Sequence, residues 1–532
     1  MQNGQNCRFC EINSANLIEK KRRKYYNESN NANFEVLVLK KIGFDNEKYV
    51  KMQSEHIRER ISKFGGKLYL EFGGKLFDDY HASRVLPGFA PDSKVKMLMK
   101  LKDQAEIVIV VNASDIEKNK IRGDLGITYD LDVLRLIDAF RGIGLLVGSV
   151  VMTRYSAQPA ADAFCKRLES LGVKVYHHYT IPGYPSDVDR IVSDEGFGKN
   201  EYIETSRSLV VITAPGPGSG KMATCLSQLY HEHKRGISAG YAKFETFPIW
   251  NLPLNHPVNL AYEAATADLN DINMIDPFHL EAYGEMTVNY NRDVEIFPVL
   301  AATFDQIYGE CPYKSPTDMG VNMAGNCIID DEACCEASRQ EIIRRFYAEQ
   351  CSVKKGLGNP ESVDKIKLIM KKTGISLDER PVIAAAKAKA EETGEPAMAI
   401  ETGKDTLVTG RTSLLMGAGA AAMLNALKSL AGINDDIHLL SPAVIEPVQE
   451  LKVKYMGNHN PRLHVDEVLI ALSVSAATNP LAKLALQQIP KLRGMEAHAT
   501  VILKEQDESV FKKFGINITC EPKYQTKKLY HK

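Results

Sequence analysis

The chain has 532 residues, of which 44% are hydrophobic and 25% charged, and its formal charge is −1. One hydrophobic core does not organise so long a chain, so we expect about three domains. Lys and Arg (66) balance Asp and Glu (67), which argues against a nucleic-acid partner bound by phosphate neutralisation. No apolar run approaches the roughly 18 residues that span a bilayer, so no membrane partner is expected. Ten cysteines in a chain of this length fit reduced thiols, and we expect a soluble, cytoplasmic protein.

Residues 1–40 differ from the rest of the chain. Asn, Gln, Lys, Arg and Glu dominate them, and no helical or strand periodicity precedes the FEVLVL run at 34–39. This composition is typical of disordered segments. We therefore predict a disordered extension over residues 1–40. We also hypothesise that it is non-native, with the natural start near residue 39.

Apolar strands and helices alternate over residues 41–325. We predict strands at Lys67–Phe72, Glu106–Val111, Leu145–Met152, Val173–Tyr179, Leu209–Thr213, Lys243–Trp250 and Val294–Leu300. Helices are predicted at Asn46–Phe64, Asp130–Arg141, Pro159–Leu171, Asp187–Glu195, Met222–Arg235 and Pro257–Leu269. This alternation implies parallel βαβ units with helices on both faces of the sheet. The predicted class is α/β, with a parallel sheet of the Rossmann-like or P-loop-like kind.

The pattern changes after residue 325. Helices are predicted at Asp330–Gln350, Glu361–Lys372 and Pro381–Glu392 without a strand between them, which indicates a small helical domain over residues 326–395. Strands at Thr406–Gly410, Ala499–Lys504 and Ile516–Pro522 and helices at Ser413–Ser429 and Glu508–Phe514 then indicate a mixed α/β domain over residues 396–532.

The stretch LVVITAPGPGSGKMATCL at 209–226 is the strongest chemical signal in the chain. A strand, a glycine-rich turn and a helix N-terminus together form the arrangement that holds phosphate, because backbone N–H groups and the helix dipole face the anion. We expect the ligand contacts to come from Gly216, Gly218, Ser219, Gly220, Lys221 and Thr224. The alternative is a turn that merely joins strand to helix, with Lys221 solvated.

This turn matches only part of the P-loop pattern G-x-x-x-x-G-K-[ST]. Gly220 and Lys221 fit its second half, but Pro215 replaces the first glycine and Met222 replaces the hydroxyl residue that ligates Mg²⁺. The pattern therefore favours phosphate binding over nucleotide hydrolysis. The cofactor stays unidentified, with a nucleotide and Mg²⁺ as the candidates.

Two further segments carry candidate residues. Arg411 lies in a second turn between a strand and a helix, where it could bind phosphate bidentately; the alternative is a well-capped helix. Asp276 and His279 lie in an acidic loop and could serve as general base or hold Mg²⁺, or the loop's Asp residues could simply cap helices. The cysteines at 311–351 lack the paired spacing of structural zinc, so no metal site is predicted.

Several runs resemble a known family. They are KIGFDNEKY near residue 41, APGPGSGKMATCLSQLYHE at 214–232, GYAKFETFPIWNLPLNHPVNLAYEAATADL at 240–269, MIDPFHLEAYG at 274–284, TGRTSLLMGAGAAAMLNALK at 409–428 and INITCEPKY at 516–524. Together they are similar to an uncharacterised bacterial family named for its domain of unknown function 1846. The resemblance implies an α/β part, a helical part and a mixed part. It brings no activity, cofactor or catalytic residue.

Two hypotheses for the function follow. The first is an enzyme that binds a small phosphorylated ligand, a nucleotide or phosphometabolite, as a phosphotransferase or hydrolase. The second is a non-catalytic protein that binds such a ligand or serves in assembly. The missing hydroxyl at Met222 favours the second, whereas the acidic loop around Asp276 favours the first. The sequence leaves open whether identical copies associate.

Overall fold

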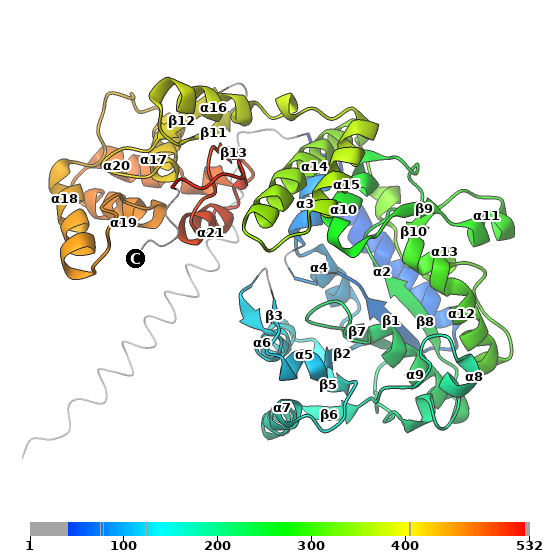
Figure 1. The fold of residues 1–532 in the computed structure, drawn as a ribbon. Helices are drawn as coiled ribbons and strands as arrows, with labels where there is room; N and C mark the ends of the chain where they lie inside the picture. Colours follow the sequence, from blue (N-terminus) through cyan, green and yellow to red (C-terminus); the bar gives the residue numbers. More distant parts are fainter. Residues whose placement is uncertain (1–40, 75, 78, 123–124, 404–405, 527–532) are drawn as a thin grey trace, which may run out of the picture.

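The computed structural model describes residues 41–526 except residues 75, 78, 123–124 and 404–405. The predicted extension over residues 1–40 lies outside these described residues. The described chain forms an N-terminal part around a parallel sheet and a C-terminal part around a smaller mixed sheet (Figure 1). The predicted α/β class is confirmed.

The sheet of the N-terminal part has six parallel strands within the described residues, in the order β6-β5-β2-β7-β1-β8. Their bounds are β1 (Leu68–Phe72), β2 (Ala105–Asn112), β5 (Leu146–Thr153), β6 (Lys174–His177), β7 (Leu209–Thr213) and β8 (Gly240–Phe244). Every residue of β1, β2 and β7 is buried, because helices cover both faces of the sheet.

Alternate strand residues enter two different cores. On β2, Ile107 and Ile109 pack into the core that includes residues of α2 (Asn46–Lys63), α4 (Ser93–Lys100), α6 (Tyr129–Gly142), α7 (Pro159–Ser170) and α10 (Pro257–Ala265). Val108 and Val110 enter the core on the other face, which includes residues of α8 (Val188–Ile191), α9 (Lys221–Lys234) and α12 (Asn291–Tyr308). This is the two-residue period of a strand that is buried on both sides.

The N-terminal part also contains shorter elements. They are α3 (Tyr80–Val85), α5 (Ala113–Glu117), the β3–β4 pair (Ile121–Arg122 and Ile127–Thr128), the β9–β10 pair (Asn273–Ile275 and Val288–Tyr290), α11 (Pro277–Tyr283) and α13 (Pro316–Met319).

The helices of residues 326–395 divide between the two parts of the molecule. Residues of α14 (Asp331–Lys354) and α15 (Pro360–Thr373) belong to the N-terminal core. The next helix, α16 (Pro381–Thr393), packs against strands of the C-terminal sheet.

The C-terminal sheet has the strand order β12-β11-β13-β14, antiparallel except for the β13–β14 pair. Its strands are β11 (Ala397–Gly403), β12 (Thr406–Arg411), β13 (Glu496–Ala499) and β14 (Asn517–Cys520). Helices α17 (Ala418–Leu430), α18 (Pro442–Glu450), α19 (Val465–Ser475), α20 (Pro480–Leu486) and α21 (Glu505–Lys513) complete its core. None of the described helices is long and apolar enough to cross a membrane.

Two predicted strands are wrong, and a third, Lys243–Trp250, shares only Lys243 and Phe244 with β8. Val294–Leu300 lies inside α12, whose buried Phe297, Phe304 and Ile307 follow a helical spacing that the short apolar run conceals. A short apolar run does not distinguish strand from buried helix. The predicted strand Ala499–Lys504 begins too late in the chain. The strand of the structure, β13, is Glu496–Ala499, and its charged and polar residues are buried in the sheet.

A buried ion-pair network joins the two parts. Glu496 on β13 accepts hydrogen bonds from Arg344 on α14 (3.1 Å to each oxygen) and from Arg380 just before α16 (2.5 Å). Arg380 is 1% exposed. Arg344 also pairs with Glu341 (2.7 Å), which in turn accepts from Arg84 (2.9 Å). Buried ion pairs therefore hold the C-terminal sheet to α14, a helix of the N-terminal part.

Removing the central carboxylate should destabilise the protein strongly. Glu496→Gln leaves buried Arg380 without its carboxylate partner and Arg344 with Glu341 alone, and we expect the free energy of unfolding to fall by about 3–5 kcal/mol. The control is Glu392→Gln, which removes a solvent-exposed partner of Lys389 and should cost at most about 1 kcal/mol. Urea denaturation measures both. Equal losses in the two variants would contradict the role given to Glu496.

Candidate functional site

The carboxyl ends of the parallel strands meet at one edge of the N-terminal sheet. From β2 the chain continues to β5, whereas from the neighbouring β7 it crosses β1 to reach β8. The connections thus leave this pair of strands in opposite directions, and a crevice at such a switch point is where open α/β sheets bind ligands. The glycine-rich loop starts there, directly after β7.

Glycine is required at several positions of this loop. Gly218 and Gly220 have φ values of +72° and +92°, a region that other residues rarely adopt. A Cβ at Gly216 would lie 2.2 Å from the hydroxyl oxygen of Tyr129. Thr153, at the end of β5, fixes the loop from the side by donating to the carbonyl of Ser219 (2.6 Å). The loop is therefore a built structure rather than a loose connection.

The loop leaves several donors free. Among the described residues, no acceptor is bonded to the backbone N–H groups of residues 218–221, where α9 begins. Lys221 is half-buried at the first position of this 14-residue helix. Its ammonium group has no hydrogen bond or ion pair within the described chain. Together these groups form a positively polarised surface, because helix N-termini carry partial positive charge.

The hydroxyl groups near the loop have other tasks. Ser219 is buried and donates to the carbonyl of Gly216. Thr224 is fully buried, and its hydroxyl lies 3.5 Å from Nδ1 of His178. Burial lowers the pKa of His178 to about 3, so His178 is neutral and the hydroxyl of Thr224 faces an uncharged side chain in the core. Met222 supplies no hydroxyl, and the structure brings no side-chain oxygen of Ser219 or Thr224 into its place.

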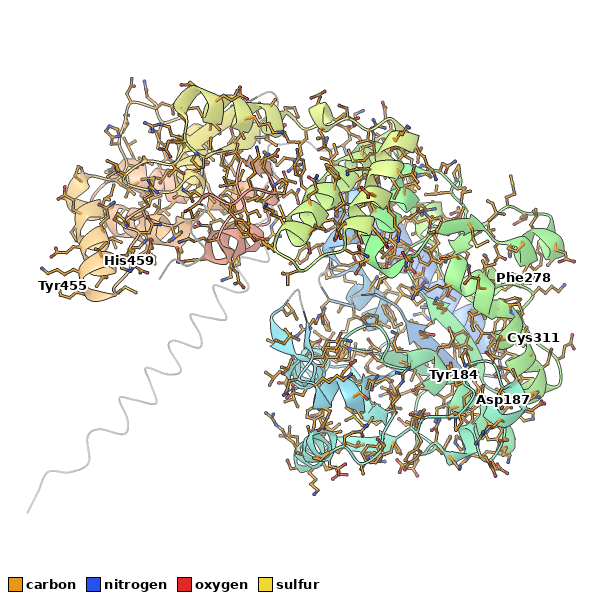
Figure 2. All side chains as sticks on the ribbon, viewed as in Figure 1. Tyr184, Asp187, Phe278, Cys311, Tyr455 and His459 are labelled. Carbon is orange, nitrogen blue, oxygen red and sulfur yellow. The ribbon has the colours of Figure 1, made fainter. Side chains whose placement is uncertain are left out.

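Asp276 and His279 lie in a different place from the loop. Asp276 is fully buried and caps α11 by accepting from the backbone of Phe278 and His279 (3.1 Å each). Its second oxygen accepts from the hydroxyl of Thr317 (2.6 Å). Asp276 is therefore a positioning residue that joins α11 to α13. Figure 2 labels Phe278 in the N-terminal part, on the side away from Tyr455 and His459.

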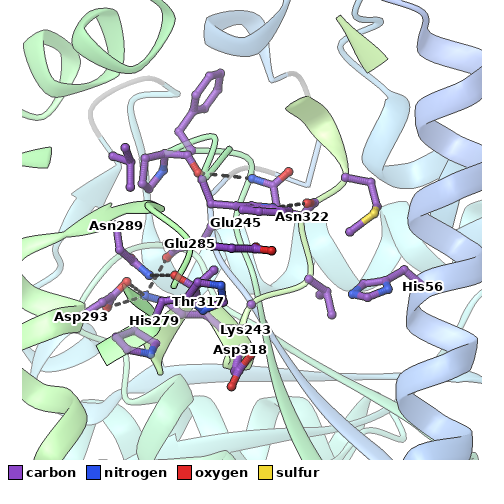
Figure 3. A pocket seen from close by; sticks show the side chains of 18 of the residues that line it. His56, Lys243, Glu245, His279, Glu285, Asn289, Asp293, Thr317, Asp318 and Asn322 are labelled. Atoms are coloured by element: carbon purple, nitrogen blue, oxygen red, sulfur yellow. Dashed lines mark hydrogen bonds and ion pairs between the residues drawn. The ribbon is translucent and has the colours of Figure 1, made fainter. Parts of the chain in front are cut away.

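A cavity of about 380 Å³ adjoins the carboxyl end of β8 (Figure 3). It lies between the end of β8, α11, α12 and the segment at residues 316–323, and His279 and Thr317 line it. Aromatic side chains of Phe247, Trp250 and Tyr283 form part of its wall. The cavity has a size typical of small-molecule sites.

A triad of half-buried charged side chains lines this cavity. Lys243 Nζ lies 2.7 and 2.6 Å from the two carboxylate oxygens of Asp293 and 3.3 Å from Glu245. Lys243 and Glu245 are two residues apart at the end of β8, so the strand period presents them on the same side. Burial lowers the pKa of Lys243, but Asp293 and Glu245 raise it more, and the net shift is upward. Lys243 is therefore a fixed cation.

Glu245 ionises near neutral pH. Burial raises its pKa to about 7, Asp293 and Glu71 act in the same direction, and Lys243 opposes them. A carboxyl group with such a pKa at the wall of a cavity can accept or donate a proton at physiological pH.

Glu71 on β1 lies between the loop and the cavity. In the sheet it is in register with Ile212 of β7 on one side and Lys243 of β8 on the other. Two strand spacings separate these neighbours, which is about 10 Å. Glu71 raises the pKa of Lys243, and it raises that of the Cys225 thiol, on which Lys221 has the opposite effect. The loop and the cavity are thus adjacent features of one sheet edge.

Arg411 is not part of this edge. It ends β12 in the C-terminal sheet and is exposed. Figure 1 shows β12 and α9 in opposite parts of the molecule. The two glycine-containing turns therefore do not face each other.

Sequence reasoning missed the triad of Lys243, Glu245 and Asp293. The spacing of Lys243 and Glu245 at a strand's carboxyl end was a usable signal. Asp293 was concealed because the residues after it were assigned to a strand rather than to α12.

Sequence reasoning also missed a cluster of His256, Asp331 and Cys335, whose ligand atoms lie within 4.8 Å of one another. His256 Nδ1 accepts from the backbone N–H of Val258 (3.3 Å), so the neutral ring carries its proton on Nε2. That nitrogen faces Asp331 (3.0 Å). The arrangement presents a proton rather than a lone pair to a cation.

Family models cover nearly all of the described chain. The N-terminal domain of unknown function DUF1846 matches residues 42–374, and its C-terminal counterpart matches residues 378–530. The chain belongs to this uncharacterised family, as the sequence resemblance predicted. It is 57% identical over 494 residues to a UPF0371 protein of Streptococcus pyogenes and 58% identical over 494 residues to one of Streptococcus thermophilus. Each alignment covers 93% of this chain and 100% of the relative.

The close contact at Gly216 yields a stability test. Gly216→Ala places a methyl group against the Tyr129 hydroxyl, and we expect the free energy of unfolding to fall by about 1–3 kcal/mol. Adding Tyr129→Phe should recover part of the loss. Gly142→Ala is the control, since nothing lies within 4 Å of the new methyl group at that helical position. A loss at Gly216 that is no greater than at Gly142 would contradict the packing described.

The raised pKa of Glu245 predicts a pH dependence. The folded state holds a proton up to about pH 7, whereas an exposed glutamate in the unfolded chain loses it near pH 4.3. Stability from this group is therefore present at low pH and is lost as the pH rises through about 7. From about pH 5 to about pH 8 the wild type should lose about 1–3 kcal/mol relative to Glu245→Gln.

Urea denaturation at both pH values checks this difference. Glu285→Gln is the matched control, because Glu285 also lines the cavity but is exposed. A pH profile of Glu245→Gln that parallels the wild type would show that Glu245 does not carry the effect.

Proposed function

We propose that this protein binds a small phosphorylated ligand, a nucleotide or phosphometabolite, through the Gly216–Lys221 loop. The observation that carries the proposal is Lys221, a half-buried ammonium group without a partner in the described chain, at a helix N-terminus whose N–H groups are free. A phosphate there would accept from the backbone and pair with the ammonium, and charge-assisted hydrogen bonds of this kind are the strong ones.

The loop supports binding more than nucleotide hydrolysis. With Met222 at the position of the Mg²⁺-ligating hydroxyl and Thr224 turned into the core, the described residues offer no substitute for that group at the loop. A phosphometabolite therefore fits the site better than a nucleotide that requires a Mg²⁺ ion held by the loop.

The adjacent cavity favours an enzyme over a protein that only binds. Glu245 ionises near neutral pH beside a fixed cation, about two strand spacings from the loop. A ligand anchored by its phosphate at Lys221 would extend toward this proton-exchanging group. The eight cysteines of the described residues are free thiols, which supports a cytoplasmic location.

Thermal unfolding in the presence of ligands tests the proposal. With ATP, glucose 6-phosphate and inorganic phosphate as probes, a ligand at about a hundred times its Kd should stabilise the wild type by about 2.7 kcal/mol. Lys221→Met should abolish this stabilisation, because it removes the ammonium and keeps the apolar stem. Lys166→Met, an exposed position on α7, should leave it unchanged. Stabilisation that survives in Lys221→Met would place the phosphate elsewhere.

A further inference from the structure

The cavity beside β8 contains two groups of polar side chains whose bonding capacity the protein does not use up. One group comprises Arg60, Tyr283 and His279, and the other comprises Lys243, Asp293 and Glu245. An unused buried donor or acceptor is costly unless a ligand or water bonds to it.

The guanidinium of Arg60 has no carboxylate partner among the residues that the structure describes. Within the described chain it donates to the carbonyl of Gly320 (3.2 Å), and that bond uses one of its five N–H groups. Burial and Asp318 raise the pKa of the Tyr283 hydroxyl to about 12, and the charge of Arg60 opposes the rise. The guanidinium is therefore near Tyr283, whose ring lies 4.6 Å from that of His279. It is a cation available to an anionic group in the cavity.

His279 adds a donor beside this cation. Ser315 Oγ accepts from the backbone N–H of Asp318 (3.1 Å) and lies 2.8 Å from Nδ1 of His279. When the Ser315 hydroxyl donates to Nδ1, the His279 ring carries its own proton on Nε2. His279 is 8% exposed, and no described residue accepts from Nε2. An oxygen of a ligand would satisfy it.

Glu245 is the unsaturated member of the other group. Asp293 engages Lys243 through both oxygens, whereas Glu245 has a single, longer contact of 3.3 Å. About a third of the Glu245 side chain is exposed, and the residue lines the cavity. Its remaining lone pairs can accept from a donor that enters there.

The charges around Glu245 favour a cationic donor. Lys243 faces it from its own strand, Asp293 from α12 and Glu71 from β1, and the Tyr262 and Tyr290 hydroxyls are close enough for Glu245 to raise their pKa. Lys243 is the one positive charge in this set, and Asp293 already engages it. An ammonium group would complete the balance at Glu245.

We propose that this cavity binds a small ligand carrying both an ammonium and a carboxylate group, an amino acid or a close analogue. Its carboxylate bonds to Arg60 and to Nε2–H of His279, and its ammonium bonds to Glu245. The volume of about 380 Å³ accommodates a molecule of this size, and the walls at Phe247 and Trp250 accept an apolar side chain. This site adjoins the loop at Lys221 but uses other residues, and the inference does not rest on phosphate binding.

The proposal predicts a proton balance. At about pH 7 roughly half of the Glu245 groups carry a proton. An ammonium ligand stabilises the ionised form, so the protonated fraction releases its proton to the buffer when the ligand binds. Affinity should therefore increase as the pH rises through about 7. A ligand that merely fills the cavity would release no proton.

Isothermal titration calorimetry with L-alanine, L-leucine, L-lysine and L-glutamate tests this proposal. The titrations are run at about pH 7 in two buffers of different ionisation enthalpy. We expect at least one of these amino acids to bind, with net proton release. Its amide and its N-acetyl derivative should each bind about tenfold or more weakly, because each loses one charged contact.

Four variants, two of them controls, assign the contacts. Arg60→Met should weaken binding about tenfold or more, whereas Arg58→Met, on the same helix and bonded to the carbonyl of Lys100, should not. Glu245→Gln should abolish the proton release, and thermal unfolding confirms that the variant is folded. Lys221→Met should bind the amino acid normally. This variant therefore distinguishes a failure of the phosphate-binding proposal from a failure of the amino-acid proposal.

The proposal is overturned if none of the four amino acids binds. It is also overturned if the amide or the N-acetyl derivative binds as well as the free amino acid, or if the wild type binds without releasing a proton.

Discussion

The placement of the C-terminal sheet depends on one buried carboxylate. Glu496 lies on an inner strand of that sheet and holds two guanidinium groups, one from α14 and one from the segment before α16. Two buried cations of this kind tolerate each other only because an anion lies between them. The C-terminal part therefore docks in one orientation, in which Glu496 meets both Arg344 and Arg380.

The same network extends toward the cavity. Glu341 on α14 accepts from Arg344 and Arg84 and lies 3.4 Å from His81 Nδ1. The ring of His81 meets Phe247 edge-on, with centroids 5.4 Å apart, and Phe247 lines the cavity. A continuous chain of contacts thus runs from the C-terminal sheet to the cavity wall. The C-terminal sheet is thus linked to the cavity wall through α14 and His81.

The sequence predicted the features that depend on local hydrophobic periodicity and on glycine-rich turns. The alternation of apolar runs and helices fixed the parallel sheet, and β7 matches its predicted bounds of Leu209–Thr213. The glycine loop and the start of α9 followed from Gly220 and Lys221. The cavity could not be predicted, because residues from β8, α12 and α2 meet there only after the sheet has formed. Their separation along the chain conceals a contact that depends on strand order.

Local polarity was the other source of error. Glu496 and His498 give β13 the appearance of a surface segment, yet both are buried because Arg380 and Thr519 bond to them. Conversely, the apolar run that begins at Val294 suggests a strand but forms one face of α12. In both cases the tertiary partner decides the structure, and no local pattern contains that partner.

The outer edge of β8 has a consequence for solubility. A sheet edge with free N–H and C=O groups can recruit strands of other chains. Here the backbone N–H of Val321 donates to the carbonyl of Lys243 (2.9 Å), and a single parallel bridge pairs Lys243 with Gly320. The segment that forms the cavity wall is thus also what covers this edge. Changes that enlarge the cavity by displacing residues 320–323 would uncover an edge strand that can pair with other chains. Protection against aggregation and the shape of the cavity therefore depend on the same few residues.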